Sequence, residues 1–129
     1  MASNILNLTT CMTTAYNHTN KDGKYRIYWA HVPQHRGKHQ GYIGVTKLTE
    51  IGLGMRYGIE IPEALDPNKV RSKRRVHDFM NKYYDSVIIE TIAEGLTKKE
   101  ALKLERELRP YDNKGKHFSK YNWNERKGG

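Results

Sequence analysis

Two segments rich in β-branched and aromatic residues, joined by a short polar loop, constrain the fold of this chain most. The first covers residues 25–32 and is ended by Pro33, and the second covers residues 41–46. The loop between them, residues 34–40, is polar and contains a glycine. Strand-forming residues bounded by turn residues at this spacing are typical of a β-hairpin. We therefore predict two neighbouring strands in this region.

The rest of the chain contains the signals of several helices and of one further strand. The expected elements are a short, irregular helix over residues 49–58, a loop at Pro62 and at Asp66 and Pro67, a helix over residues 68–85 capped by Asn68, a strand over residues 86–92 broken by Gly95, and a helix from the capping box of Thr97 and Glu100 to Pro110. Residues 1–24, with a short strand around residues 13–16, are expected to form an N-terminal extension, and residues 25–129 a single domain. Three strands with helices between and after them predict an α+β fold.

The charge of the chain indicates an anionic partner. Its 129 residues include 23 Lys and Arg against 14 Asp and Glu, which gives a net charge of +9. Such an excess favours nucleic acid or another acidic surface as the partner. The longest apolar run, residues 27–30, is too short to span a bilayer, so we expect no membrane association. A single cysteine, Cys11, excludes an internal disulfide and a zinc site built on cysteine pairs.

Glu105 is the first candidate for chemistry. It lies at the border of the apolar stripe that Ala101, Leu104 and Leu108 form on the last predicted helix. A carboxylate in such a place can hold a divalent cation that solvent still reaches, and Mg²⁺ often needs only one or two protein carboxylates. The alternative is an ordinary surface glutamate that pairs with Arg109, four residues later.

Tyr28 and Tyr42 fall on the two predicted strands of the hairpin. Tyrosines in strands usually pack as half-buried residues, and this is one interpretation of the pair. If the two side chains lie side by side near cations, however, the phenolate becomes accessible and a phenol can act as a general base. The two tyrosines are therefore candidate catalytic residues.

A basic run and a series of histidines are the candidates for contact with nucleic acid. Five of the seven residues 69–75 are Lys or Arg, which suits phosphate contacts, although a merely solvated helix face is the alternative. His31, His35 and His39 recur every four residues, but a proline and a glycine between them preclude a helix. They form either a zinc site or a solvated loop near nucleic acid. The residues expected to contact nucleic acid are Lys47, Arg71, Lys73, Arg74, Arg75 and His77.

Taken together, these features resemble the GIY-YIG nuclease family. Ile27-Tyr28 stands where the family has the end of its GIY tripeptide, with Arg26 in place of the glycine, and Tyr42-Ile43-Gly44 is the YIG tripeptide intact. Residues 76–84 resemble the middle helix of the phage homing endonucleases of this family. Residues 100–107 resemble its metal-binding helix, with Glu105 on the glutamate that binds the metal.

Two further positions follow from the resemblance. The family's arginine on the helix after the hairpin falls on Arg56, with Arg71 and Arg74 as alternatives. The histidine that often follows it is replaced by Glu60, so that role is vacant or is taken by His77. Tyr121-Asn122, followed by Gly128-Gly129, resembles the closing motif, in which Asn122 would orient a loop or the phosphate.

The resemblance implies a small three-stranded antiparallel sheet flanked by helices, and hydrolysis of DNA phosphodiester bonds with one divalent metal. Glu105 would bind Mg²⁺ or Mn²⁺, and Arg56 would neutralise charge on the phosphate. Tyr28 would act as the base, and Tyr42 would hydrogen-bond the water or the phosphate. The pKa of the base would have to fall from about 10, and Lys47, Arg56 and the metal would supply the cations that lower it.

The expected protein is a DNA endonuclease of the homing or stand-alone phage type that acts on double-stranded DNA as a monomer or weak dimer. The first residues contain neither the basic nor the apolar region of a signal peptide, so we expect a cytoplasmic location, in the bacterial cytoplasm if a phage encodes the protein. One alternative is a non-catalytic nucleic-acid-binding module of the same fold. Another is an RNA-binding protein with a basic helix.

Overall fold

The sheet has three antiparallel strands in the order β2–β1–β3. The computed structural model describes residues 19–66 and 74–128, and the strands are β1 (Tyr25–His31), β2 (Tyr42–Thr46) and β3 (Ile88–Leu96). Both β2 and β3 pair with β1 in the antiparallel sense. The prediction of an α+β fold with a small three-stranded antiparallel sheet is thereby confirmed. The strand expected around residues 13–16 lies outside the described residues.

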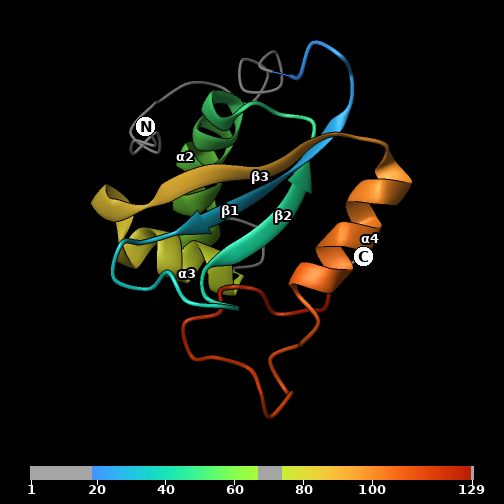
Figure 1. Cartoon of the computed structure of the whole chain (residues 1–129). Helices are drawn as coiled ribbons and strands as arrows, with labels where there is room; N and C mark the ends of the chain where they lie inside the picture. The colour runs from blue at the N-terminus through green and yellow to red at the C-terminus, as the bar shows by residue number, and fades with distance from the viewer. Residues whose placement is uncertain (1–18, 67–73, 129) are drawn as a thin grey trace.

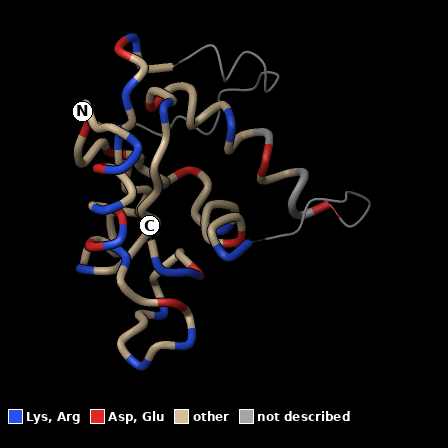
Figure 2. Tube along the Cα trace, turned by 90° about the vertical axis from the view of Figure 1, so that its right-hand side faces the viewer, with Lys and Arg blue, Asp and Glu red and all other residues tan. Residues whose placement is uncertain are grey.

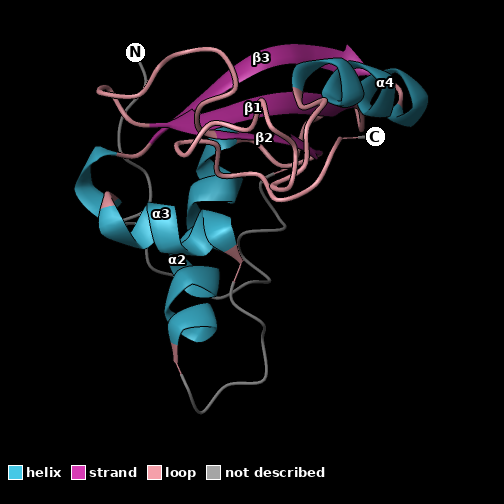
Figure 3. Ribbon diagram, turned by 90° about the horizontal axis from the view of Figure 1, so that it is seen from below, coloured by secondary structure: helices cyan, strands magenta, loops and turns pink. Residues whose placement is uncertain are grey.

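The helices are arranged in two groups around the sheet. Helices α2 (Glu50–Leu65) and α3 (Arg75–Lys82) lie together against one face, and α4 (Lys98–Leu108) lies apart from them, alongside the sheet (Figure 1, Figure 3). A 3₁₀ turn, η1 (Tyr84–Ser86), connects α3 to β3. The core cluster consists of Tyr28, Ala30, Val32, Leu48, Leu53, Tyr57, Ile61, Val76, Met80, Val87, Ile89 and Trp123. Among the helices that the structure describes, none has both the length and the apolar character needed to cross a bilayer.

The predicted hairpin is present, and its register decides which side chains meet. Across β1 and β2, Tyr28 pairs with Gly44 and Ala30 pairs with Tyr42. Residues opposite each other, or two apart along a strand, share a face of the sheet, so Tyr28 and Tyr42 lie on the same face. A Cβ atom at Gly44 would lie 2.5 Å from the Tyr28 hydroxyl oxygen. The glycine of the YIG tripeptide therefore leaves room for the Tyr28 ring.

Strand β3 differs from its predicted bounds at both ends. It begins at Ile88, because the residues before it form the 3₁₀ turn, and it continues through Gly95 to Leu96. Gly95 has a φ angle of +70°, which interrupts a regular strand, yet Leu96 still pairs with Tyr25 after a shift of register. Pairing with β1 thus carries the strand past the glycine.

Helix α2 is longer than the sequence predicts. It has 16 residues and contains Pro62, where we expected a loop. Glycine and proline both weaken helices, by about 1 and 3 kcal/mol respectively in a helix interior. However, Leu53, Tyr57 and Ile61 are at most 2 % exposed, and the burial of this apolar face offsets these costs. Tertiary packing overrides the weak local propensity here.

Helix α3 begins at Arg75 rather than at Asn68, so the predicted start of this helix is wrong. Arg74 has an extended backbone, and its backbone N–H donates to His77 Nδ1 at 3.3 Å. This side-chain contact caps the helix at its first turn. The predicted cap residue, Asn68, lies outside the described residues.

Candidate active site

Three tyrosines lie together where the hairpin packs against α2. The ring centroids of Tyr28 and Tyr42 are 6.0 Å apart, so these two side chains are neighbours. The hydroxyl oxygens of Tyr28 and Tyr57 are 2.8 Å apart, so one hydroxyl donates a hydrogen bond to the other. The sequence predicts core packing or base stacking for Tyr57 but not its contact with Tyr28, because that partner lies on a distant strand.

The surroundings of Tyr28 oppose the role of general base. Its side chain is 2 % exposed, and burial together with the adjacent Tyr57 raises its pKa well above the ordinary value of 10. Burial likewise raises the pKa of Tyr57 to about 12, although the charge of Arg56 acts in the opposite direction. The charge of Arg56 lowers the Tyr28 pKa, as expected, but burial and the neighbouring tyrosines outweigh it. Lys47, another of the expected cations, instead has its Nζ atom 4.9 Å from the ring centroid of Tyr25.

Arg56 lies beside these tyrosines and pairs with Glu60. Its Cζ atom is 5.0 Å from the ring centroid of Tyr57, and its Nε atom is 3.3 Å from Glu60 Oε1. Two more basic groups approach the second oxygen of Glu60, His77 Nε2 at 3.6 Å and Arg74 Nη2 at 3.9 Å. Residues 60 and 77, the two positions weighed for the family's histidine, are thus in contact with each other.

Glu105 lies on α4 next to the edge of β2. Arg109 Nη1 is 3.3 Å from Glu105 Oε2 and donates a hydrogen bond to the Ile43 carbonyl oxygen at 2.9 Å. The Arg109 Cζ atom is 5.5 Å from the ring centroid of Tyr42. The ion pair offered as the alternative interpretation of Glu105 is therefore present, and it also links Glu105 to Tyr42.

The residues around Glu105 could hold a divalent cation only through a single carboxylate, with water and phosphate oxygens as the other ligands. Across residues 19–66 and 74–128, no group of three or more His, Cys, Asp or Glu side chains could hold a metal ion. A single carboxylate can still bind Mg²⁺, because this ion keeps several waters and takes phosphate oxygens as ligands. Glu105 is 9 % exposed, and Arg109 contacts its Oε2 atom, so a bound cation would have to share or replace that contact.

A pocket of about 400 Å³ opens beside Tyr42. It is lined by Tyr42, Arg74, Val76, Arg109, Trp123, Glu125 and Arg126. Three of these residues are arginines and one is a glutamate, so the pocket suits an anionic group. Guanidinium groups bind phosphate oxygens through paired, charge-assisted hydrogen bonds. We call this site the Tyr42 pocket.

The contacts around the Tyr42 pocket form a continuous series. In order, they join Glu105, Arg109, Tyr42, Tyr28, Tyr57, Arg56, Glu60 and Arg74, and both Arg74 and Arg109 line the pocket. Four predicted catalytic residues, Tyr28, Tyr42, Arg56 and Glu105, belong to this series. They come from β1, β2, α2 and α4. The fold therefore brings together residues that lie far apart in the sequence.

Asn122, the fifth predicted catalytic residue, lies next to this series rather than within it. Its side-chain oxygen accepts hydrogen bonds from the backbone N–H and the side-chain amide of Asn124, at 2.9 and 3.0 Å. It lines a different pocket together with Trp29. This geometry suits the loop-orienting role that the sequence suggests.

The residues predicted to contact nucleic acid in and after the basic run have different surroundings in the structure. His77 is 0 % exposed and packs against Glu60, so it cannot contact nucleic acid, and that prediction is wrong. Arg75 donates to the backbone carbonyls of Asn122 and Lys120, which holds the C-terminal segment in place. Arg74 lines the Tyr42 pocket. Arg71 and Lys73 lie outside the described residues.

The three histidines of the hairpin region have separate partners. His31, His35 and His39 lie against Trp29, Tyr121 and Tyr111, with ring centroids 3.8, 3.6 and 5.2 Å apart, respectively. His31 Nε2 is also 3.2 Å from Glu90 Oε2. The three rings thus brace different contacts.

Sequence reasoning gave Glu60 no role of its own and did not place Arg126 beside Tyr42. The position of Glu60 four residues after Arg56 was a usable signal, because side chains at this spacing meet on a helix. Arg126 offered no such signal, because its place in the pocket depends on the path of the C-terminal segment. No family model, no curated protein and no solved structure matches this chain.

Proposed function

We propose that this protein is a metal-dependent endonuclease that hydrolyses phosphodiester bonds in double-stranded DNA. The observation that carries the proposal is the continuous series of contacts that ends on both sides in arginines lining the Tyr42 pocket. A phosphate in this pocket would meet guanidinium groups from three segments, Arg74, Arg109 and Arg126, and the phenol of Tyr42. The carboxylate of Glu105 lies one contact away, through Arg109. The net charge of +9 supports an anionic polymer as the substrate.

The residues would divide the work according to their exposure. When bound by Glu105, Mg²⁺ or Mn²⁺ would supply positive charge for the transition state and an activated water. Arg74 and Arg126 would neutralise the non-bridging phosphate oxygens. Tyr42 is partly exposed and would hydrogen-bond the attacking water or the phosphate. Tyr28 is buried and would keep the Tyr42 ring in place, so its role changes from base to positioning residue.

A non-catalytic nucleic-acid-binding module of the same fold is the second candidate. The ion pair between Arg109 and Glu105 favours it, because Glu105 would then serve as a structural partner of the arginine. Both candidates place a phosphate in the same cationic pocket. They differ in whether the phosphodiester bond is cleaved.

Cleavage of supercoiled plasmid in the presence of Mg²⁺ or Mn²⁺ separates the two candidates. We expect conversion to nicked or linear DNA, and we expect EDTA to stop it. Glu105→Gln should lower the rate by more than about 100-fold, because metal-assisted charge stabilisation is worth several kcal/mol. Glu107→Gln, a matched change of an exposed glutamate on the same helix, should leave the rate unchanged.

Binding to a labelled duplex in EDTA completes the test. The Glu105→Gln variant should bind as the parent does, because its arginines are intact. A parent protein that binds duplex DNA but cleaves it with neither metal would refute the nuclease proposal and leave the binding module. Undiminished cleavage by a folded Glu105→Gln variant would refute the metal-binding role of Glu105.

A further inference from the structure

Two loops that are far apart in the sequence form a single surface below the sheet in the view of Figure 1. We call residues 33–41 and 110–122 the paired-loop surface. Gly41 donates its N–H to the Tyr121 carbonyl at 2.9 Å, and its own carbonyl accepts from Trp123 N–H at 2.8 Å. The His35 ring stacks on the Tyr121 ring, with centroids 3.6 Å apart and an interplanar angle of 15°. These contacts hold the two loops to each other.

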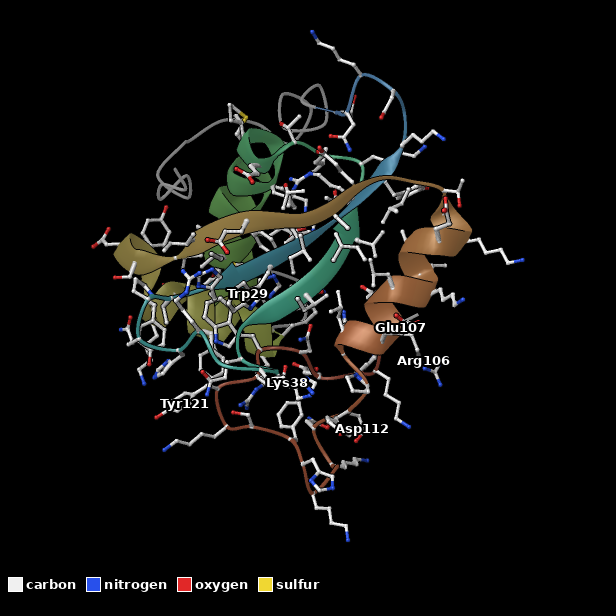
Figure 4. The ribbon with its side chains drawn as sticks, in the orientation of Figure 1. Trp29, Lys38, Arg106, Glu107, Asp112 and Tyr121 are labelled. Carbon is white, nitrogen blue, oxygen red and sulfur yellow. The ribbon has the colours of Figure 1, made fainter. Side chains whose placement is uncertain are left out.

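Exposed cations from both loops gather on this surface. Its basic residues are Arg36, Lys38, Lys114, Lys116 and Lys120, and all five are exposed. Lysines and arginines recur along the lower loop in Figure 2, and Lys38 and Tyr121 both lie below the sheet in Figure 4. The one acidic residue of these two segments is Asp112, whose carboxylate accepts the Lys114 backbone N–H at 3.0 Å. Arg36 Nη2 also lies 3.6 Å from Glu90 Oε1 of β3, so the local excess of positive charge comes mainly from the four lysines.

The aromatic rings of this surface are already engaged within the protein. Tyr121 is stacked on His35, and Lys120 Nζ lies 4.9 Å from the centroid of the same tyrosine ring. Tyr111 contacts both His39 and His117, with centroids 5.2 and 5.6 Å away. Single-stranded nucleic acid is usually bound by open aromatic faces on which bases stack. The exposed lysines of the paired-loop surface favour phosphate contacts instead, and such contacts bind the backbone of a duplex.

The paired-loop surface adjoins the Tyr42 pocket on two sides. Gly41 directly precedes Tyr42, and Asn122 directly precedes Trp123, and both following residues line the pocket. Arg75 reinforces this junction, because its side chain donates to the carbonyls of Asn122 and Lys120. A polyanion that lies along these two loops would therefore reach the pocket where the loops end.

We propose that the paired-loop surface binds the phosphate backbone of duplex DNA and holds the strand against the Tyr42 pocket. The identity of the partner as DNA rests on the proposed function. The contacts carry no base readout, so binding at this surface is independent of sequence.

The test is the salt dependence of duplex binding in EDTA, measured by fluorescence anisotropy with a labelled oligonucleotide. The test variant combines Lys38→Ala, Lys114→Ala and Lys116→Ala. The matched control combines Lys98→Ala, Lys99→Ala and Lys103→Ala, which removes the same charge from exposed positions of α4. Each phosphate contact contributes a slope of about −0.9 in log K against log salt. The test variant should therefore bind all duplexes more weakly, with a slope flatter by about 2.7, and the control should follow the parent.

The outcomes distinguish this inference from the proposed function. A test variant that binds with the parent's affinity and slope overturns the paired-loop surface, even if the parent cleaves plasmid. A parent that prefers single strands, and loses that preference in the test variant, overturns the duplex assignment. If the parent does not cleave DNA but the test variant loses duplex binding, the paired-loop surface is supported and only the nuclease proposal is refuted. Replacing the three lysines by arginine should retain binding, and its loss there would show that charge is not the cause.

Discussion

Removing the hydroxyl of either Tyr28 or Tyr57 should destabilise the protein, whereas removing both should cost no more than removing one. The two hydroxyl oxygens are 2.8 Å apart, and the two residues are 2 % and 0 % exposed. A single Tyr→Phe change leaves the remaining hydroxyl buried without this partner, which costs about 1–3 kcal/mol. The double variant removes both polar groups and keeps both rings, so little desolvation penalty remains. We therefore expect the coupling energy in the double-mutant cycle to be at least as large as one single cost, at least about 1 kcal/mol.

Urea unfolding followed by tryptophan fluorescence measures this cycle, because Trp123 belongs to the same core cluster as both tyrosines. Tyr25→Phe is a matched control at a partly exposed tyrosine of β1, and it should change the free energy of unfolding by less than about 0.5 kcal/mol. Strictly additive costs for Tyr28→Phe and Tyr57→Phe would refute the reasoning. So would single variants as stable as the parent, because the buried hydroxyls would then have other partners.

Three further predictions concern the three neighbouring tyrosines of the candidate site and the glycine beside them. Folding raises the pKa of Tyr57 to about 12 and that of Tyr28 well above 10, so the neutral phenols stabilise the fold fully below about pH 10 and lose this effect as the pH rises towards 12. The urea midpoint of the parent should therefore fall over this pH range, and that of Tyr57→Phe should fall less. Equal pH profiles of the two proteins would contradict this prediction. Gly44→Ala should cost about 1–3 kcal/mol of stability through collision with the Tyr28 ring. The control Gly37→Ala should cost less, because the added methyl group faces only the end of a flexible glutamine side chain. Equal urea midpoints of the two variants would refute the collision argument. Tyr42→Phe should slow DNA cleavage by about 10²–10³-fold, because it removes one hydrogen bond to the transition state. This loss should exceed that of Tyr28→Phe, and the reverse order would restore Tyr28 as the base.

Local patterns predict those elements in which every residue favours the same structure. The hairpin follows from two strand-forming runs, and α4 follows from the capping box of Thr97 and Glu100. The predictions stop too early in α2 and in β3, where Pro62 and Gly95 indicate a break. In both cases a distant segment decides the outcome, because the buried face of α2 and the pairing with β1 outweigh the local signal.

The candidate site divides in the same way. Tyr42 and Gly44 belong to the same short motif. A side chain at residue 44 would collide with the Tyr28 ring across the hairpin, so this position requires glycine. The tyrosine pair at residues 28 and 57 spans 29 positions of the sequence, so no local spacing signals it. The burial of His77 is equally non-local, because the carboxylate that it contacts lies on another helix. Motifs thus indicate which residues are special, and tertiary contacts decide which of them reach solvent.

Arg109 is the residue through which the C-terminal segment completes the Tyr42 pocket. Its guanidinium donates to the Arg126 carbonyl at 3.1 and 2.9 Å and to the Ile43 carbonyl at 2.9 Å, and it pairs with Glu105. The segment also passes close to α4, because a Cβ atom at Gly128 would lie 2.5 Å from the Glu105 carbonyl oxygen. Replacing Arg109 would therefore disturb β2, α4 and the C-terminal segment together, and a loss of activity there would not identify a phosphate ligand. Arg126 accepts these hydrogen bonds through its backbone and presents an exposed side chain to the pocket, so Arg126→Ala isolates phosphate binding from the architecture of the site.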